Sequence, residues 1–214
     1  MIISWCPIAT TCTLRRLSGS RVGAYWNSWA CIPSDIDLID VYSCFPSAVQ
    51  VAVNELGLPD ELPLTVTGGL TFGGGPLNNY VMHSIARMVE LLRESRDQRG
   101  VITANGGYLT KHAFGVYSGV PPEKDFQHRN VQAEVDATPA RMSLVDYDGE
   151  VVIESYTVMY AGEGPAVGHA ACLTPDGGRT WANTEDPEVM KAMTEEEFCG
   201  RRARIDGAGN LTVL

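Results

Sequence analysis

The stretch DLIDVYSCFPSAV, residues 37–49, joins a β-strand pattern directly to the start of a helix. Residues 37–45 are β-branched and apolar enough for a buried strand. Pro46 suits the first helical turn, and Gly57 stands where a helix end favours a positive φ. The apolar face of this helix is expected to consist of Val49, Ala52, Val53 and Leu56. The segment therefore predicts a strand-to-helix unit.

The residues that follow repeat this alternation. LTVT (64–67) predicts a short strand, GGLTFGGGP (68–76) a glycine-rich loop, and residues 77–94 a helix with one apolar stripe. GVITA (100–104) and AFGVYS (113–118) predict two further strands separated by NGGYLTKH. Alternating strands and helices of this kind are typical of an α/β layered sheet.

The pattern changes beyond residue 121. PPEKDFQHRN (121–130) is polar and contains prolines. We therefore expect a first structural unit over 35–122 and a linker at 123–130. Residues 131–214 alternate apolar and polar positions, with Asp-Gly turn signals at 148–149 and 176–177. This region predicts a mainly antiparallel β domain, a small barrel, with one short helix within 185–200.

Residues 1–34 differ from the rest of the chain. They hold three of the four Trp, three of the six Cys and three Arg, but no acid and no clear period. One interpretation is an artefact, either a displaced start or an out-of-frame reading. The other is an ordered, partly buried N-terminal arm.

Composition excludes several classes of protein. The net charge of −10 and the lack of a Lys/Arg cluster argue against a nucleic-acid partner. No run of about 18 apolar residues is present, which argues against a transmembrane helix. The six cysteines form no CxxC pair and no regular spacing, which favours a reduced, cytoplasmic location without a metal site.

Three segments, in order, resemble the C-terminal half of the thiolase superfamily: VYSCFPSAV (41–49), GGLTFGGGP (68–76) and TANGGYL (103–109). In that family the first segment begins with Asn or His, which positions a catalytic water; here the position is Tyr42. The second carries the histidine base, which falls on Gly75. The third carries an acid–base cysteine, which falls on Ala104. Glycine and alanine side chains cannot exchange protons, so the resemblance implies degenerate catalytic positions.

Degenerate thiolase motifs followed by a β-rich domain resemble bacterial thiolase-like proteins of type 1, whose extra C-terminal domain is OB-like. The resemblance implies an α/β, partial thiolase-like C-terminal domain followed by a small antiparallel β (OB-like) domain. It implies the acetyl-CoA acetyltransferase (acyltransferase) family and lipid metabolism, but no condensation or thiolysis by this chain alone. The acyl-accepting cysteine of a thiolase belongs to an N-terminal half without a counterpart here. No cofactor is required, and coenzyme A or acyl-CoA is the expected ligand.

The glycine-rich loop and the segment after Ala104 are the expected ligand-binding positions. A loop before a helix can hold a phosphate or a pantetheine arm, although this one matches neither GxxxxGK[ST] nor GxGxxG. The other interpretation is a tight turn inherited from the fold. The candidate binding residues are Gly73, Gly74, Gly75, Asn105, Gly106 and Gly107.

The remaining candidates are single side chains. Cys44 is a possible nucleophile but fits better as a structural cysteine in a buried strand. His83 lies off the apolar stripe of its helix and is expected to be a solvated or interface residue. His112, in the loop after the glycine pair, is a weak candidate base, with a structural role as the alternative.

Other polar residues carry no functional prediction. His128 belongs to the expected linker. His169 and Cys172 are three residues apart and, in a strand, should face opposite sides, so they do not form a zinc site. The acidic run 195–197 is expected to be a solvated helix face.

Two alternatives to an acyl-CoA-related protein stay open. One is a non-catalytic binding or assembly module whose β domain docks a protein partner or an acyl carrier. The other is a truncated fragment without independent function, whose uncovered strand edges and apolar helix faces would lead to association with a homodimer partner or an upstream thiolase half.

Overall fold

The computed structural model describes the backbone of residues 4–9 and residues 35–59, 61–121, 126, 128, 130–137, 139–162 and 164–214. The chain divides into two compact units, Met1–Thr138 and Pro139–Leu214. The expected linker, 123–130, lies largely outside the described residues. So does the segment 1–34, except for one strand.

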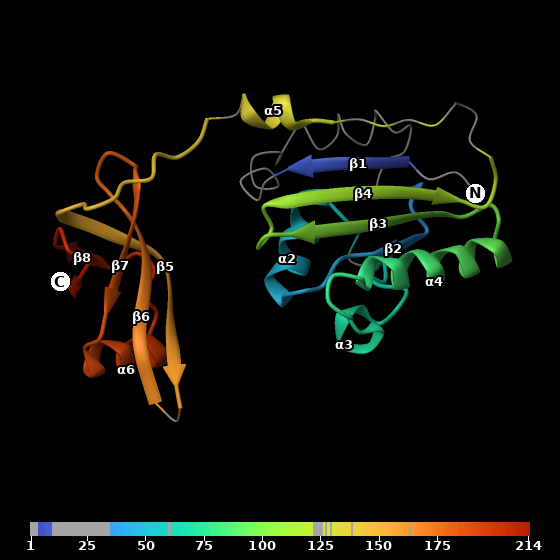
Figure 1. Cartoon of the computed structure of the whole chain (residues 1–214). Helices are drawn as coiled ribbons and strands as arrows, with labels where there is room; N and C mark the ends of the chain where they lie inside the picture. The colour runs from blue at the N-terminus through green and yellow to red at the C-terminus, as the bar shows by residue number, and fades with distance from the viewer. Residues whose placement is uncertain are drawn as a thin grey trace. The chain divides into compact units, whose positions relative to one another are not determined.

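The first unit is a four-stranded sheet with helices (Figure 1). Its elements are β1 (Ser4–Ala9), β2 (Leu38–Asp40), α2 (Pro46–Leu56), α3 (Gly69–Gly73), α4 (Tyr80–Glu94), β3 (Arg99–Gly106), β4 (Lys111–Ser118) and α5 (Gln132–Asp136). The strand order is β1-β4-β3-β2, in which β2 and β3 are parallel and the other pairs antiparallel.

Helices α2 and α4 cover opposite faces of this sheet. Val101 packs with Ala52 and Leu56 of α2, whereas its neighbour Ile102 packs with Met88 of α4. Since successive side chains of a strand point to opposite faces, these two small cores lie on either side of β3. The first unit is therefore layered, as the sequence predicts.

Several predicted boundaries were wrong in this unit. The strand expected over 37–45 is Leu38–Asp40, because the chain turns aside after Asp40 and Val41 donates to the carbonyl of Leu64. LTVT (64–67) forms no strand, because its polar groups bond to the Asp40 carboxylate instead of to a neighbouring strand. Helix α4 begins at Tyr80 and not at 77, since Leu77 has a left-handed φ of 51°.

The second unit is an antiparallel sheet of five strands with one helix. Its elements are β5 (Gly149–Ala161), β6 (Gly164–Leu173), β7 (Arg179–Thr184), α6 (Pro187–Glu195), β8 (Arg202–Ile205) and β9 (Leu211–Val213). The strand order is β7-β6-β5-β8-β9. A parallel bridge between Asn183 and Asn210 then joins the two outer strands, so the sheet curls into a small, partly closed barrel.

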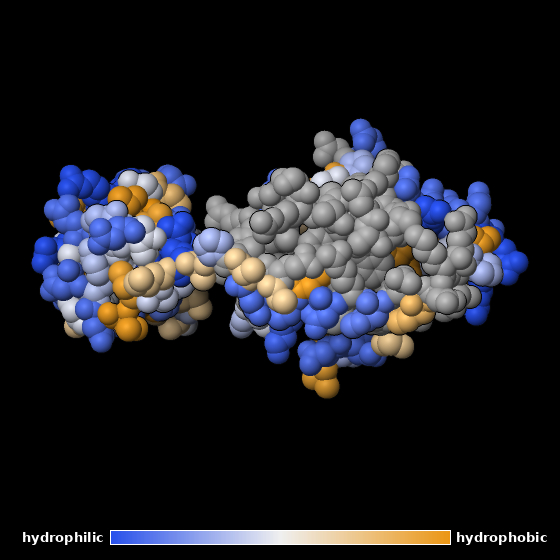
Figure 2. All heavy atoms as spheres, turned by 90° about the horizontal axis from the view of Figure 1, so that it is seen from above, coloured by the Kyte–Doolittle hydropathy of each residue, from blue (hydrophilic) through white to orange (hydrophobic). Residues whose placement is uncertain are grey.

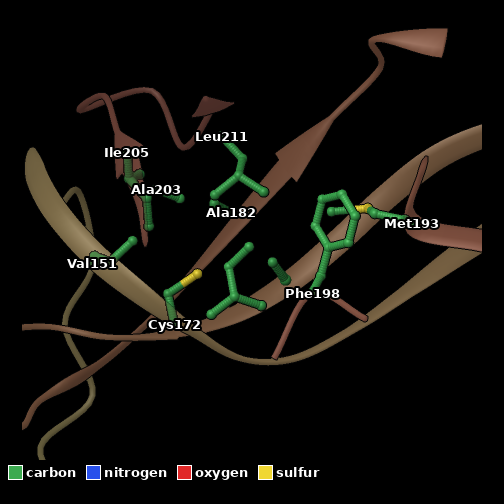
Figure 3. Close-up of a cluster of buried hydrophobic side chains, with 10 residues drawn as sticks. Val151, Cys172, Ala182, Met193, Phe198, Ala203, Ile205 and Leu211 are labelled. Atoms are coloured by element: carbon green, nitrogen blue, oxygen red, sulfur yellow. The ribbon is translucent and has the colours of Figure 1, made fainter. Parts of the chain in front are cut away.

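The core of this barrel is apolar (Figure 3). Side chains from all five strands, from α6 and from the segment after it point toward one another, among them Val151, Cys172, Phe198 and Ile205. Asp186 caps α6 by accepting from the amides of Glu188 and Val189, and Pro187 occupies its first turn.

The described surface on the face shown in Figure 2 is mostly hydrophilic, with separate hydrophobic patches.

Candidate functional site

The three motif segments meet at one edge of the first sheet. Strands β2 and β3 run parallel, so the residues that follow β2 lie beside the end of β3. Tyr42 donates its amide to Oγ1 of Thr103 at 2.8 Å, which ties the two ends together. Ligands of open α/β sheets bind at the carboxyl ends of strands. This edge is therefore the candidate site.

Cys44 lies next to Asn105 in this site. Its Sγ donates to Oδ1 of Asn105 at 3.2 Å, and the thiol is half-buried. The expectation that Cys44 sits in a buried strand was wrong, because β2 ends four residues earlier. In the described part of the chain the partner of this thiol is an amide and not a histidine. An amide cannot remove the thiol proton, so the pair lacks an activating base.

A buried carboxylate organises the loops around this pair. Asp40 is fully buried, and its two oxygens accept five hydrogen bonds of 2.6–3.2 Å. The donors come from the segment after α2 and from α4, namely the hydroxyls of Thr65, Thr67, Tyr80 and Ser84 and the amide of Val66. A buried charge is stable only when such donors replace its water. Asp40 thus fixes the glycine-rich segment relative to β2.

The start of the glycine-rich segment is a helix, α3, and not the expected open loop. Ser43 accepts the amide of Leu70 at 2.9 Å, and Thr65 accepts the amide of Gly69 at 2.8 Å. A Cβ at Gly69 would lie 2.7 Å from the Ser43 hydroxyl, which explains the glycine. These two amides already have partners within the chain. They are therefore unavailable to a phosphate.

Of the other glycines in this segment, Gly73 and Gly75 lie against neighbouring side chains, whereas Gly74 faces open space. Gly74 has a φ of 68° and a ψ of 158°, a conformation that belongs to glycine. A Cβ at Gly75 would lie 3.3 Å from Cδ2 of Leu70, and one at Gly73 would lie 3.1 Å from the Tyr80 ring. The space beside position 75 is thus already taken by Leu70. Glycine has no side chain that could accept or release a proton at this position.

His83 holds the glycine-rich loop. Its Nδ1 donates to the carbonyl of Gly73 at 2.7 Å, and the side chain is half-buried. The sequence predicts a solvated or interface residue; in the structure the side chain keeps partial exposure and its hydrogen-bond partner is the loop, which folds back onto α4. A hydrogen bond to a carbonyl requires the proton on Nδ1, which leaves Nε2 as the acceptor in the neutral ring.

His112 lies in strand β4 and not in the expected loop. It pairs across the strands with Asn105. Its Nε2 donates to the carbonyl of Leu109 at 2.8 Å, which fastens the turn between β3 and β4. Burial lowers the pKa of His112, so the ring is neutral near pH 7. This geometry gives His112 a structural contact in the turn.

The segment TANGGYL forms the end of β3 and the turn after it. Ala104 pairs with Ala113 of β4, and its methyl group offers no acid or base. A Cβ at Gly106 would have open space, and Gly107 has a left-handed φ of 57°. The two glycines shape the turn, and Asn105, like Thr103, supplies a polar side chain to the site.

Tyr42 faces the same edge. Its ring contacts Tyr80 edge to face, with centroids 5.5 Å apart. Burial, with a smaller effect of the nearby Cys44, raises the pKa of the Tyr42 hydroxyl. The phenol therefore stays protonated at neutral pH and can donate a hydrogen bond, but it is not a base.

Sequence reasoning missed an aromatic pair beside Cys44. The rings of Phe45 and Tyr108 are stacked, with centroids 6.0 Å apart and planes 19° apart. A signal was present in the sequence, because an aromatic residue directly follows the cysteine in the first segment and the glycine pair in the third. These residues are Phe45 and Tyr108.

The other singled-out residues lie outside the three motif segments. His169 and Cys172 face opposite sides of β6 as predicted: His169 Nδ1 contacts Oδ1 of Asn183 at 2.7 Å, and Cys172 is in the core. Residues 195–197 are exposed, and His128 is an exposed residue outside any element. Among the described ranges no group of three His, Cys, Asp or Glu side chains could hold a metal ion.

Known proteins resemble both units. The family described as "Thiolase-like protein type 1 additional C-terminal domain" matches residues 130–210. A crystal structure of a monomeric SCP2-thiolase-like protein type 1 from Mycobacterium smegmatis matches 99% of this chain with 29% identity and a TM-score of 0.83. The chain is therefore similar to thiolase-like proteins of type 1, and residues 130–210 match their additional C-terminal domain.

The chain covers 50% of the length of the mycobacterial structure. A second solved structure, the peroxisomal 3-ketoacyl-CoA thiolase of Saccharomyces cerevisiae, matches 54% of the chain and 32% of its own length at 16% identity, with a TM-score of 0.39. No curated protein matches the chain by sequence. No helix in the described parts of the chain is long and apolar enough to cross a membrane.

Proposed function

We propose that this thiolase-like protein binds an acyl-CoA thioester at the edge formed by the ends of β2 and β3 and by α3, without catalysing condensation or thiolysis. The observation that carries the proposal is the Cys44–Asn105 pair, in which the thiol donates to an amide at 3.2 Å. Gly75 and Ala104 stand where the family has its histidine and second cysteine. Polar groups that can bind a thioester lie at this edge, and the described positions 75 and 104 carry no side-chain acid or base, which supports binding without catalysis.

Turnover is the first test. Purified protein is incubated with acetyl-CoA alone, and with acetoacetyl-CoA plus coenzyme A, and the thioester products are followed. We expect neither condensation nor thiolysis above the protein-free rate. Turnover that disappears on changing one residue of the site, such as Cys44→Ala, would defeat the proposal.

Binding is the second test. Calorimetry with acetyl-CoA should show heat of binding that is weakened in Gly74→Ala, because alanine cannot keep the φ and ψ of Gly74. Gly57→Ala is the control: Gly57 also has a left-handed φ, 62°, but it ends α2 away from the loop. No heat for the unchanged protein would argue against a ligand site.

The same proposal covers the cellular setting and the second unit. Cys44, Cys172 and Cys199 are free thiols, which supports a reduced, cytoplasmic location. The strand order, the parallel bridge and the helix between β7 and β8 support an OB-like barrel. As partners of the chain we propose a second copy of itself or an upstream thiolase half. Sedimentation of the purified chain at several concentrations tests for the homodimer, and sedimentation of a mixture with the upstream half tests for the second partner.

An assembly module is the second candidate function. Trp181 is 64% exposed on the outer face of β7, and large exposed aromatic side chains are typical anchors of protein interfaces. Two polar pairs flank it, His169–Asn183 and a bidentate contact of Arg179 with Glu154. No heat with any coenzyme A thioester, together with partner capture that Trp181→Ala abolishes, would favour this function.

A further inference from the structure

The aromatic pair beside the site differs from ordinary surface residues. Tyr108 is 85% exposed and Phe45 is 43% exposed, yet their rings stack. Phe45 is adjacent to Cys44 in sequence, and Tyr108 follows Asn105 by three residues. The rings therefore stand beside the hydrogen-bonded thiol and amide.

The turn that presents Tyr108 is held in a costly conformation. Gly107, Tyr108 and Leu109 all have left-handed φ values, 57°, 54° and 66°. Two of these residues are not glycine, and such conformations persist only where surrounding contacts impose them. The contacts here are the amide of Thr110, which donates to the carbonyl of Gly106 at 3.0 Å, and His112, which donates to that of Leu109.

These contacts hold a large flat ring in water without burying it in the protein. Exposure of an aromatic ring to water is unfavourable in free energy, and this ring stabilises the fold only through its contact with Phe45. A planar ligand would cover the ring and remove it from water. The polar Cys44–Asn105 pair next to the rings suits a carbonyl, and the rings suit a flat apolar group attached to that carbonyl.

We propose that the site selects thioesters whose acyl group is planar and conjugated, an aromatic or α,β-unsaturated acyl chain that stacks on Tyr108 and Phe45. The inference rests on the proposed acyl-CoA function and specifies its substrate class. No bond is made or broken; the claim concerns affinity alone.

The test compares two thioesters of equal size, benzoyl-CoA and cyclohexanecarbonyl-CoA, by calorimetry on the full chain. Stacking of one aromatic pair predicts benzoyl-CoA to bind tighter by roughly 2- to 12-fold. In Tyr108→Leu this ratio should fall to about one, while Tyr108→Phe should keep it, because the ring and not the hydroxyl is required. Thermal unfolding of both variants checks that the fold is retained.

Each failure has a distinct meaning. If neither thioester nor acetyl-CoA binds, the proposed function itself fails. If all three bind but benzoyl-CoA shows no advantage, or keeps its advantage in Tyr108→Leu, the selection for planar acyl groups is overturned and the proposed function stands.

The adenine of coenzyme A is a second flat group that could stack on the same rings. Benzoyl-pantetheine and cyclohexanecarbonyl-pantetheine, which lack adenine, should show the same ratio as the coenzyme A esters. If Tyr108→Leu instead weakens coenzyme A, acetyl-CoA and benzoyl-CoA by the same factor, the ring binds adenine and the acyl assignment is wrong.

Discussion

At the scale of single residues, the buried Asp40 carboxylate decides how the site is held. Its five donors come from separate parts of the chain, so their geometry depends on a charged acceptor. We expect Asp40→Asn to lower the free energy of unfolding by about 2–4 kcal/mol, because an amide turns one acceptor into a donor that faces other donors. Urea unfolding measures this change.

The matched control for Asp40 is Asp97→Asn, an exposed acid in the turn after α4. Its change should stay within about 0.5 kcal/mol. If Asp40→Asn were as mild as Asp97→Asn, the carboxylate would not organise the loops.

His112 is expected to make the stability of the chain depend on pH. Its pKa is lowered by burial, so the unfolded chain binds a proton more readily than the folded one below the ordinary histidine value of 6.5. The sign of the linkage then predicts that stability falls as the pH drops below about 6.5 and is unaffected by this residue above it. Denaturant midpoints at pH 8 and pH 5 should differ less in His112→Gln.

The exposed His128 provides the comparison for that measurement. His128→Gln should leave the pH dependence as it is in the unchanged protein. An equal flattening by both variants would show that His112 has no special part in it.

Cys172 should be inert toward alkylation. Burial, with a smaller effect of Glu154, raises its pKa to about 11, and the side chain is fully enclosed in the barrel. At pH 8 both thiolate and access are lacking. Peptide mapping after iodoacetamide treatment should find Cys199, which is exposed, modified before Cys172, and both modified in denaturant. Equal rates in the folded protein would contradict the buried placement.

At the scale of elements, the packing of α4 on β3 depends on a glycine. A Cβ at Gly100 would lie 2.2 Å from the Met88 sulfur, so Gly100→Ala should push the helix from the strand and cost about 1–3 kcal/mol. Gly106 lies in the same strand with open space at its Cβ, and Gly106→Ala should change stability little. Thermal unfolding of the two variants separates packing from strand propensity.

A second substitution tests the cause of that loss. Gly100→Ala should cost less stability when it is introduced into Met88→Ala than when it is introduced into the unchanged protein, because the methionine sulfur is then absent. A simple sum of the two single effects would show that the sulfur is not the obstacle.

The sequence predicted the elements whose signals are local. Helix α2, with Pro46 in its first turn and Gly57 at its end, was correct, as was the alternation of the β-rich region. The predictions failed where a distant side chain decides the local structure. Thr65 and Thr67 favour a strand by type, yet Asp40, 25 and 27 residues away, engages their hydroxyls instead.

The sequence resemblance placed residues 42–44, the glycine-rich loop and Asn105 at positions that belong to the active site of one family. The structure ties residues 42–44 to Thr103, Asn105 and Leu70 by hydrogen bonds. The resemblance could not show that Cys44 pairs with Asn105, that His83 holds Gly73, or that Phe45 stacks on Tyr108. These contacts depend on side-chain directions across 10 to 63 residues of chain.

At the scale of the whole molecule, each unit has a core of its own. The barrel buries ten residues in one cluster, drawn entirely from Val151 to Leu211. We expect a fragment spanning 139–214 to fold alone, since domains of this size can be stable without a partner. Circular dichroism should show cooperative thermal unfolding that does not change with protein concentration.

The same measurement on the full chain addresses the fragment alternative. Cooperative unfolding that is independent of concentration would count against a truncated product that survives only by association. A midpoint that rises with concentration would instead reveal that the first unit depends on a partner.

The bridge between Asn183 and Asn210 bears on how the protein behaves when heated or concentrated. Outer strands with unpaired amides recruit strands from neighbouring copies, which is how fibrils and swapped dimers begin. At this bridge the backbone groups of β7 and of the residues before β9 bond to each other, and the amide of Asn183 donates to the carbonyl of Gly209 at 2.8 Å. Ordered aggregation of the chain should therefore not begin at the part of the barrel where these two outer strands meet.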